Sequence, residues 1–412
     1  MTTRSGWVEW VSMSADPPPT LVVRTVQRDT PLPLSDALSG DVTGAWTHGD
    51  DGLVGLGMAL VLPLRDGLDE ASDIWRRIVA TAAVHDDVHV DGSGLVGFVS
   101  TAFDGAGGRL VVPARILGRR DGVAFETTIE GGNVRDVAEP TGPGAVTVVD
   151  GPLSGTEWRH RVAEASARIR SGALAKVVLA RSVVATTECP VDLRWLALRL
   201  AEAYPDCWTY VVGPLVGATP ELLVRLRGGI AESRVLAGTV SRSDDPAEDE
   251  ALAAWLVQSS KDLSEHEYAV QSVTERLEQL GELQVTGPSL LTLPNVRHLA
   301  TDVRVAVTGR SVLDLAAALH PSAAVCGTPR EDALAMIAEI EGIDRGVYAG
   351  GVGWIDAAGD GEIGIALRCG VRTGERELTA YAGGGIMGDS VPDDELAETD
   401  AKLRPVLDAL RA

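Results

Sequence analysis

The sequence predicts a mixed α/β protein with much antiparallel sheet, and three observations support this fold class. The 412 residues are 45% hydrophobic and 23% charged, a balance that is typical of folded globular chains. Long segments with apolar residues at helical spacing are interleaved with short β-branched runs. Several of those runs are joined by tight turns, which indicates hairpins and argues against strict alternation of strand and helix.

The first 150 residues show local patterns of both kinds. Apolar positions between Leu68 and Val84 recur at helical spacing and predict an amphipathic helix. The turn Arg120-Asp121-Gly122 predicts a hairpin into the strand VAFETTI. Residues 137–155 are rich in Pro, Gly and Thr, and are predicted to connect two halves of the chain. Further strands are predicted at LVVRTV near the N-terminus, as an edge strand, and over 95–104 and 110–118.

The second half is more strongly patterned. Helices are predicted over 157–170, 193–203, 249–279, 312–319 and 330–341, and from Asp393 onward. Strands are predicted over 176–186, 208–213, 222–228, 303–308, 347–356, 363–373 and 378–385.

Charge and composition exclude several classes of function. With 36 basic and 59 acidic residues, the net charge of −23 argues against binding to nucleic acid or anionic membranes. The longest apolar run, 52–64, is too short to span a bilayer, and Met1–Met13 lacks the apolar region of a signal peptide. The four cysteines have no zinc-like spacing and suit a reducing compartment. We therefore expect a cytoplasmic protein.

Two acidic pairs are the first candidate site. Asp262 and Glu265 are three residues apart on one predicted helix, and Glu395 and Glu398 are three apart on another, so each pair shares a helix face. Four carboxylates from two helices suit Mg²⁺, which binds oxygen and needs few protein ligands. The alternative is two solvated helix faces, and spacing alone favours that alternative.

Other charged residues lie in apolar surroundings. Lys176 opens the strand KVVLAR, and Glu221 enters the strand that follows Pro220. Each residue could have a structural role only. If the side chains instead face a cleft, Lys176 could act as a base and Glu221 as a protonated general acid. Arg368 lies inside the apolar run IALRCG, where a buried guanidinium needs an anionic partner. The glycine run 381–386 offers backbone amides to an anion, or else forms a tight strand-to-helix turn.

In combination, these motifs resemble the chorismate-utilising enzymes. This family includes the isochorismate, salicylate, anthranilate and aminodeoxychorismate synthases. The matching elements occur in one order over roughly residues 155–412, whereas residues 1–150 show only a weak echo in GFVSTAFD. They are KVVLAR (176–181), GATPELL (217–223), LAGT (236–239), KDxxEH (261–266), HLAT (298–301), LHPSAAVCGTPR (319–330), the Arg368 strand and AGGGIMGDSVPDDELAETDAK (382–402).

The resemblance implies a fold and a set of roles. It implies a single large domain over 1–412, with two stacked, mostly antiparallel sheets, helices outside and the active site between the sheets. Mg²⁺ would be held by Glu265, Glu395 and Glu398, with Asp262 in support. Chorismate would be bound by Arg368, His298, Lys402 and the amides of Gly383, Gly384 and Gly385, with Gly238, Thr239, Thr301 and Ala324 also lining its site.

Three positions indicate which member of the family the chain resembles. Lys176 stands where ammonia-using members carry glutamine, and resembles the members that activate water. Ala237 replaces the nucleophilic lysine of aminodeoxychorismate synthases. Ala324 replaces a threonine that is frequent in the lyases, and resembles the isochorismate synthases, which stop before pyruvate is lost.

The resemblance therefore implies a Mg²⁺-dependent isomerase that converts chorismate to isochorismate. Lys176 would take a proton from water, which attacks C2, and Glu221 would protonate the departing C4 hydroxyl. The product would feed menaquinone, siderophore or salicylate synthesis, and the enzyme would be a monomer without a glutaminase partner. Two alternatives stay open, namely a salicylate synthase that goes on to eliminate pyruvate, and a non-catalytic protein that binds Mg²⁺ or an anion.

Overall fold

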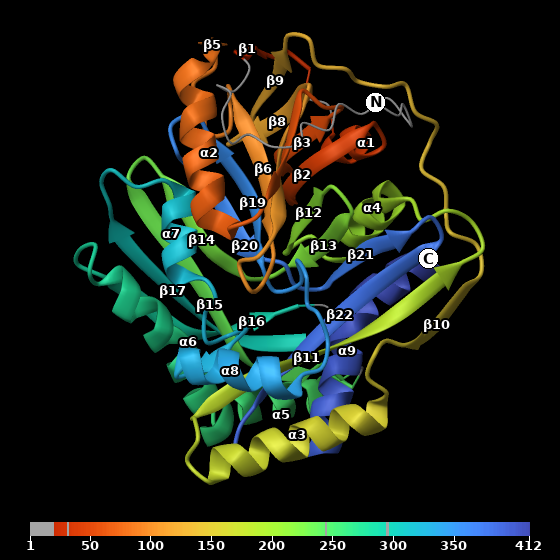
Figure 1. Cartoon of the computed structure of the whole chain (residues 1–412), viewed down its shortest axis with the longest axis vertical. Coiled ribbons are helices and arrows are strands. Elements are labelled where there is room, and N and C mark those ends of the chain that lie inside the picture. The colour runs from red at the N-terminus through yellow and green to blue at the C-terminus, as the bar shows by residue number, and fades with distance from the viewer. Residues whose placement is uncertain (1–19, 31–32, 244, 294–295) are drawn as a thin grey trace.

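Two large sheets face each other at the centre of the computed structural model, and helices lie on the outside (Figure 1). The structure describes residues 20–30, 33–243, 245–293 and 296–412. The N-terminal stretch that was analysed for a signal peptide therefore lies outside the described residues. Within the described part of the chain, the paired strands are antiparallel except β1 with β5. The predicted fold class, with two stacked and mostly antiparallel sheets, is confirmed.

The larger sheet has thirteen strands in the described residues. Its order is β10 (Val146–Asp150), β11 (Lys176–Thr187), β22 (Glu377–Ile386), β21 (Cys369–Gly374), β13 (Leu215–Thr219), β12 (Trp208–Val212), β2 (Val42–His48), β3 (Asp51–Leu56), β8 (Arg115–Arg120), β9 (Val123–Ile129), β1 (Val22–Gln27) and β5 (Ala83–Asp86), with β18 (Gly327–Thr328) also paired to β11.

The smaller sheet has nine strands in the same described ranges. Its order is β16 (Gln284–Thr292), β17 (Val296–Ala306), β15 (Ile230–Ser241), β14 (Leu222–Arg227), β20 (Gly361–Ile365), β19 (Gly351–Asp356), β6 (Val96–Thr101), β7 (Gly108–Val112) and β4 (Leu60–Leu64). Both sheets take strands from both halves of the chain.

The helices are mostly amphipathic and cover the outer faces of the sheets. Helix α2 buries Ile74, Trp75 and Ile78, and packs beside α7 against the smaller sheet. Helix α3 begins at a capping box formed by Ser154 and Glu157. The helices are α1 (Leu34–Leu38), α2 (Gly67–Thr81), α3 (Gly155–Arg170), α4 (Leu193–Ala203), α5 (Pro246–Leu256), α6 (Ser260–Leu277), α7 (Val312–Leu319), α8 (Arg330–Ile340) and α9 (Pro392–Arg411).

The main core lies between the two sheets, where large side chains of one sheet fit over glycines of the other. The ring of Phe98 lies 2.5 Å from the position that a Cβ atom on Gly44 would take, and Trp46 lies 2.7 Å from that position on Gly364. A second core fills the space between the larger sheet and helices α1, α4 and α9. Within the described residues, no helix is long and apolar enough to cross a membrane.

Two segments that the sequence predicts as single strands are each divided between the two sheets. Residues 110–118 form β7 and β8, and the chain passes from one sheet to the other at Pro113, which has no N–H to donate to a strand ladder. Residues 363–373 form β20 and β21, with the crossing at Arg368, whose φ of 48° interrupts the extended backbone. The predicted long strands were therefore wrong at both positions.

Other predicted elements also differ from the structure. The helix predicted over 249–279 is two helices, because Ser259 caps α6 by accepting the backbone N–H of Asp262. The predicted connector 137–155 contains β10, which pairs with β11. Strands β2, β5, β13, β15, β16 and β18 and helix α1 were not predicted. Strand β16 is mostly exposed, so it lacks the apolar pattern on which strand prediction relies.

A buried ion pair ties α8 to the strands beside the centre of the molecule. Arg345 donates to Glu341 at 2.7 Å through Nε, to the carbonyl of Val325 at 2.8 Å and to that of Val178 at 2.7 Å. The Glu341 carboxylate accepts the N–H of Ala180 at 2.8 Å. Both charged side chains are almost inaccessible to solvent. The two charges therefore neutralise each other, and their remaining hydrogen bonds are made with nearby backbone groups.

We expect Arg345→Met to lower the free energy of unfolding by about 3–5 kcal/mol, because the Glu341 carboxylate would be left buried without its counter-charge. Urea unfolding followed by circular dichroism measures this loss. Arg168→Ala, which breaks an exposed pair with Glu339, is the matched control and should cost far less, because water screens that pair. Equal losses in the two variants would contradict the structural importance of the buried pair.

Candidate active site

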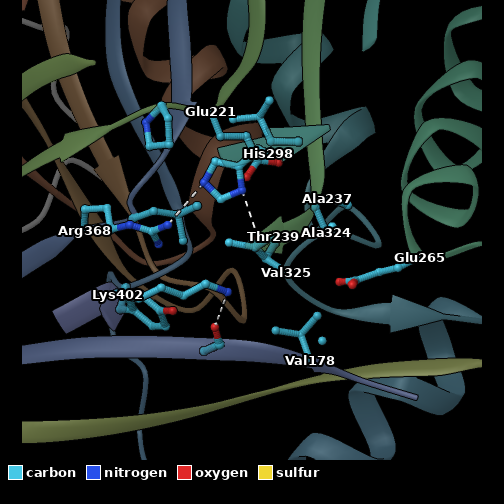
Figure 2. Close-up of a pocket in the computed structure, with 17 residues that line it drawn as sticks. Val178, Glu221, Ala237, Thr239, Glu265, His298, Ala324, Val325, Arg368 and Lys402 are labelled. Carbon is cyan, nitrogen blue, oxygen red and sulfur yellow. Dashed lines mark hydrogen bonds between the residues drawn. The ribbon is translucent and has the colours of Figure 1, made fainter. Parts of the chain in front are cut away.

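A cavity lies between the two sheets, next to α6 and α9, and half of the charged residues that the sequence singled out line it (Figure 2). The larger sheet, the segments beside it and α9 contribute cationic, glycine and apolar groups, whereas the smaller sheet and α6 contribute acids, a histidine and apolar groups. The cavity is lined by Val178, Pro220, Glu221, Leu236, Ala237, Gly238, Thr239, Glu265, His298, Ala324, Val325, Tyr348, Leu367, Arg368, Gly383, Gly385 and Lys402.

Arg368 reaches the cavity because it is the residue at which the chain crosses from β20 to β21. Its backbone is held by a hydrogen bond from the N–H of Ala218 to its carbonyl, at 3.2 Å. The side chain is buried, and burial lowers the pKa of the guanidinium. Among the described residues it forms no ion pair with a carboxylate. No acidic side chain in direct contact therefore neutralises its charge, which faces the cavity.

His298 is neutral and holds Arg368 from the side. Burial, and then the charges of Arg368 and Lys402, keep the pKa of His298 well below its usual range. Arg368 Nη2 donates to His298 Nε2 at 3.5 Å, so the proton of the neutral ring is on Nδ1. That proton is donated to Thr239 Oγ1, 2.9 Å away on the neighbouring strand. The arrangement is visible as dashed lines in Figure 2.

Lys176 lies behind the cavity wall and is paired with an acid that lines it. The side chain is completely buried, and its Nζ is 2.9 Å from Glu265 Oε1 on α6. The pair passes directly over Gly385, where a Cβ atom would lie 2.2 Å from Glu265 Oε1 and 2.9 Å from Lys176 Cε. A side chain at position 385 would therefore force Glu265 and Lys176 to move.

Helix α9 contributes the second group of charges. Glu395 is buried and accepts a hydrogen bond from Ser390 Oγ at 2.6 Å, and its other oxygen lies 3.1 Å from the Cβ position of Gly384. Glu398 is paired with Lys402 one turn later. Lys402 also donates to the carbonyl of Gly383 at 2.9 Å.

The glycine run does not form the turn that was considered as an alternative. Gly383, Gly384 and Gly385 lie inside β22, opposite Ala180, Leu179 and Val178 of β11. On its other side, β22 pairs with β21 only as far as Ala380. In the described residues, that edge of the glycine run therefore has no strand partner, and it lies beside the cavity.

The acids have the donor chemistry that Mg²⁺ requires, although no complete metal site is formed. Among the described residues, no three His, Cys, Asp or Glu side chains are grouped closely enough to hold a metal ion. Glu265 and Glu398 are neutralised by Lys176 and Lys402. Asp262 accepts a hydrogen bond from Ser259, the residue that caps its own helix. Carboxylate oxygens nevertheless fit a hard cation, which would have to replace the two lysines at Glu265 and Glu398.

Glu221 holds a proton at neutral pH. It is buried at the start of β14, and burial raises its pKa to about 8, although Lys176, Arg368 and Lys402 each lower it in part. A protonated carboxyl group is a hydrogen-bond donor. The cavity therefore contains a group that can donate a proton, in a wall that also carries neutral His298.

Not every residue predicted for the site lines the cavity. Thr301 is buried behind it and bonds to His266, and Gly384 faces Glu395. Lys176, Asp262, Glu395 and Glu398 lie around the cavity and not on its surface. Conversely, the sequence analysis missed Tyr348, a buried tyrosine whose ring stacks on Tyr381 at 5.3 Å. The only signal for it was a tyrosine within the apolar run VYAGG.

Comparison with known proteins decides the family. The family model described as chorismate binding enzyme matches residues 136–411. This chain belongs to that family. Isochorismate synthase DhbC of Bacillus subtilis (strain 168) is 40% identical over 269 residues, which are 62% of this chain and 67% of the relative. Isochorismate synthase EntC of Escherichia coli (strain K12) is 37% identical over 260 residues, covering 61% and 66% respectively.

A solved structure supports the same relationship over nearly the whole chain. The menaquinone-specific isochorismate synthase MenF of Escherichia coli has a TM-score of 0.79 and 25% identity, and the match covers 96% of each chain. Anthranilate synthase component I of Streptococcus pneumoniae has a TM-score of 0.66 at 20% identity, which shows a shared fold. The cavity offers the cationic side chains of Arg368 and Lys402 and the unpaired edge of the glycine run, groups that suit an anionic ligand.

We expect Gly385→Ala to weaken chorismate binding without unfolding the protein, because the new methyl group would displace the Glu265 carboxylate, which lines the cavity. Isothermal titration with chorismate measures the effect, and thermal unfolding checks the fold. Gly155→Ala is the matched control, since its Cβ would meet nothing closer than Leu396 at 3.5 Å. Normal binding by the Gly385 variant would contradict the proposed importance of this contact.

Proposed function

We propose that the protein is a Mg²⁺-dependent isochorismate synthase, an isomerase that adds water to C2 of chorismate and releases the C4 hydroxyl. The observation that carries the proposal is that two groups able to transfer protons are placed at one cavity. Glu221 lines the cavity and holds a proton, and Lys176 lies behind the cavity wall, next to Gly385. The names of DhbC, EntC and MenF support the same activity.

Glu221 suits the role of general acid. Its pKa of about 8 means that the carboxyl group is protonated over the physiological range, and can give its proton to the leaving hydroxyl. Desolvation of the buried carboxyl group is the dominant cause of the raised pKa. The resulting carboxylate would be stabilised by the nearby positive charges of Arg368 and Lys402.

Lys176 suits the role of general base towards water. Its ammonium group is paired with Glu265 in this structure, so the pair must open and the lysine must lose its proton before it can accept one from water. No glutamine occupies this position, and no glutaminase partner is expected. We also propose that the enzyme is a monomer.

The substrate carboxylates would be divided between two groups of residues. Arg368 would bind the enolpyruvyl carboxylate, supported by His298 and Thr239. The amides of Gly383–Gly385 and the ammonium group of Lys402 would bind the ring carboxylate. Mg²⁺ held by Glu265, Glu395 and Glu398, with Asp262 in support, would supply Lewis-acid polarisation and orientation of that carboxylate.

A salicylate synthase is the second candidate function, since it would share the lysine and the acid. Ala324 lines the cavity and has only a methyl group, so it provides no hydroxyl to assist the loss of pyruvate. We therefore favour release of isochorismate, which would feed menaquinone or siderophore synthesis. A non-catalytic binding protein would not need a protonated Glu221 beside a buried lysine.

We expect Lys176→Ala and Glu221→Gln each to lower kcat by about 10²–10⁴-fold, because each removes one proton-transfer group.

Wild-type kcat/KM should fall as the pH rises through about 8, where Glu221 loses its proton. This fall should be absent in Glu221→Gln. A stopped assay of isochorismate formation between pH 6 and 9 measures both effects, and Glu164→Gln on the exposed face of α3 is the control. Near-wild-type turnover in either site variant would overturn its assigned role.

We expect purified protein with chorismate and Mg²⁺ to form isochorismate without pyruvate, and EDTA to abolish the reaction. Chromatography with mass detection identifies the product, and a coupled assay follows pyruvate. Salicylate with stoichiometric pyruvate would favour the second candidate function. Activity that persists in EDTA would sink the magnesium proposal while leaving the proton-transfer pair intact.

A further inference from the structure

We propose that His266 and Thr301 are positioning residues that hold α6 in place, so that the Glu265 carboxylate meets Lys176 at the cavity. The resemblance to the family places Thr301 among the substrate-binding residues, whereas the structure shows its hydroxyl engaged elsewhere. The kinetic part of this proposal rests on the proposed function. The structural part rests on two groups of contacts between α6 and the smaller sheet and one contact between α6 and the larger sheet.

The imidazole of His266 links α6 to two neighbouring strands. Its Nδ1 is 3.2 Å from the carbonyl oxygen of Ala237 on β15, and its Nε2 is 2.7 Å from Thr301 Oγ1 on β17. A carbonyl oxygen only accepts hydrogen bonds, so Nδ1 carries the ring proton and Nε2 accepts the proton of the Thr301 hydroxyl. Each nitrogen therefore has a defined role: the Ala237 carbonyl selects the tautomer, and the Thr301 hydroxyl donates to the remaining nitrogen.

Burial agrees with a neutral ring in this position. His266 and Thr301 are each 3% exposed. Burial lowers the pKa of His266 below its ordinary value. Thr301 does not line the cavity, whereas Ala237 and Glu265 do. The hydrogen bonds of His266 therefore connect one residue of the cavity wall to the helix that carries another.

A second observation shows that α6 is seated closely on β15. The pairing of β15 with β17 shifts by one residue between Ala237 and Thr239, which leaves Gly238 in a bulge with φ +76°. A Cβ atom on Gly238 would lie 3.1 Å from Cβ of Asp262 and 3.2 Å from its carbonyl oxygen. The first turn of α6 thus packs on the bulge, and the His266 ring fixes the next turn.

The third contact is the ion pair of Glu265 with Lys176, which the first two contacts hold in position. Glu265 directly precedes His266 on the helix, and its Oε1 lies 2.9 Å from Lys176 Nζ. Rotation of the helix about its axis would move Glu265 away from both Lys176 and Gly385. Because a displacement of about 1 Å at a reacting centre can cost about 10²-fold in rate, a small rotation would be enough to impair the site.

Thr301→Val tests the proposal, because it keeps the shape of the side chain and removes only the hydroxyl group. We expect a loss of about 10-fold or more in kcat/KM for chorismate and a similar rise in the Mg²⁺ concentration for half-maximal activity. Thr301→Ser should recover most of both losses. Thr127→Val is the matched control, since Thr127 is another buried strand threonine, bonded to Thr25 at 2.8 Å and distant from the cavity. It should leave both values unchanged.

A measurement that does not depend on activity separates this proposal from the proposed function. In protein labelled with ¹⁵N-histidine, the wild-type spectrum should show His266 as the neutral Nδ1–H tautomer, assigned with His266→Asn. Thr301→Val should keep the Nδ1–H tautomer but shift the Nε2 resonance, because Nε2 loses its hydrogen-bond donor, and Thr301→Ser should keep the wild-type Nε2 resonance. If the wild type forms no isochorismate, the proposed function fails and the spectrum alone decides whether Thr301 holds the His266 ring. An unchanged spectrum in Thr301→Val, or equal kinetic losses in Thr127→Val and Thr301→Val, would overturn the positioning role.

Discussion

Burial of charge between the two sheets is the constraint on which the rest of the site depends. The fold encloses Lys176, Glu221, Arg368 and Glu395 where water cannot solvate them, and each charge is accommodated differently. Lys176 takes Glu265 as a counter-ion, Glu221 keeps its proton, and Arg368 donates to a neutral histidine. Glu395 accepts from Ser390. Such an environment strengthens every electrostatic contact that a bound anion would make.

The absence of side chains at Gly383–Gly385 in β22 is as important as the charges around this strand. Because β22 has no Cβ atoms at three successive positions, carboxylates from two different helices approach its backbone closely. The same absence leaves the strand edge open beside the cavity. Helix α6 uses a similar device at Gly238, where the bulge in β15 receives it. Close approach of helices to strands, and not flexibility, explains these glycines.

The sequence predicted more of the site than of the strand pattern. Motif matches located Glu221, His298, Arg368 and Lys402, which all line the cavity. They also include Thr301, which does not line the cavity and bonds to His266, because a motif records which residues recur and not which partner each contacts. The break at Arg368 was not predictable, since a positive φ at a non-glycine residue leaves no mark in an apolar run. Strand β16 was missed because its exposed residues lack alternation.

The crossing at Arg368 has a mechanical consequence. Residues 366–368 covalently join the two sheets beside the cavity, and belong to neither of them. The glycine strand is part of the larger sheet, while His298 is part of the smaller one. A ligand held by Arg368, His298 and the glycine amides together is therefore a non-covalent cross-link between two layers. Occupancy of the cavity would stiffen the interface between the layers and couple substrate binding to the resistance of the whole fold to unfolding.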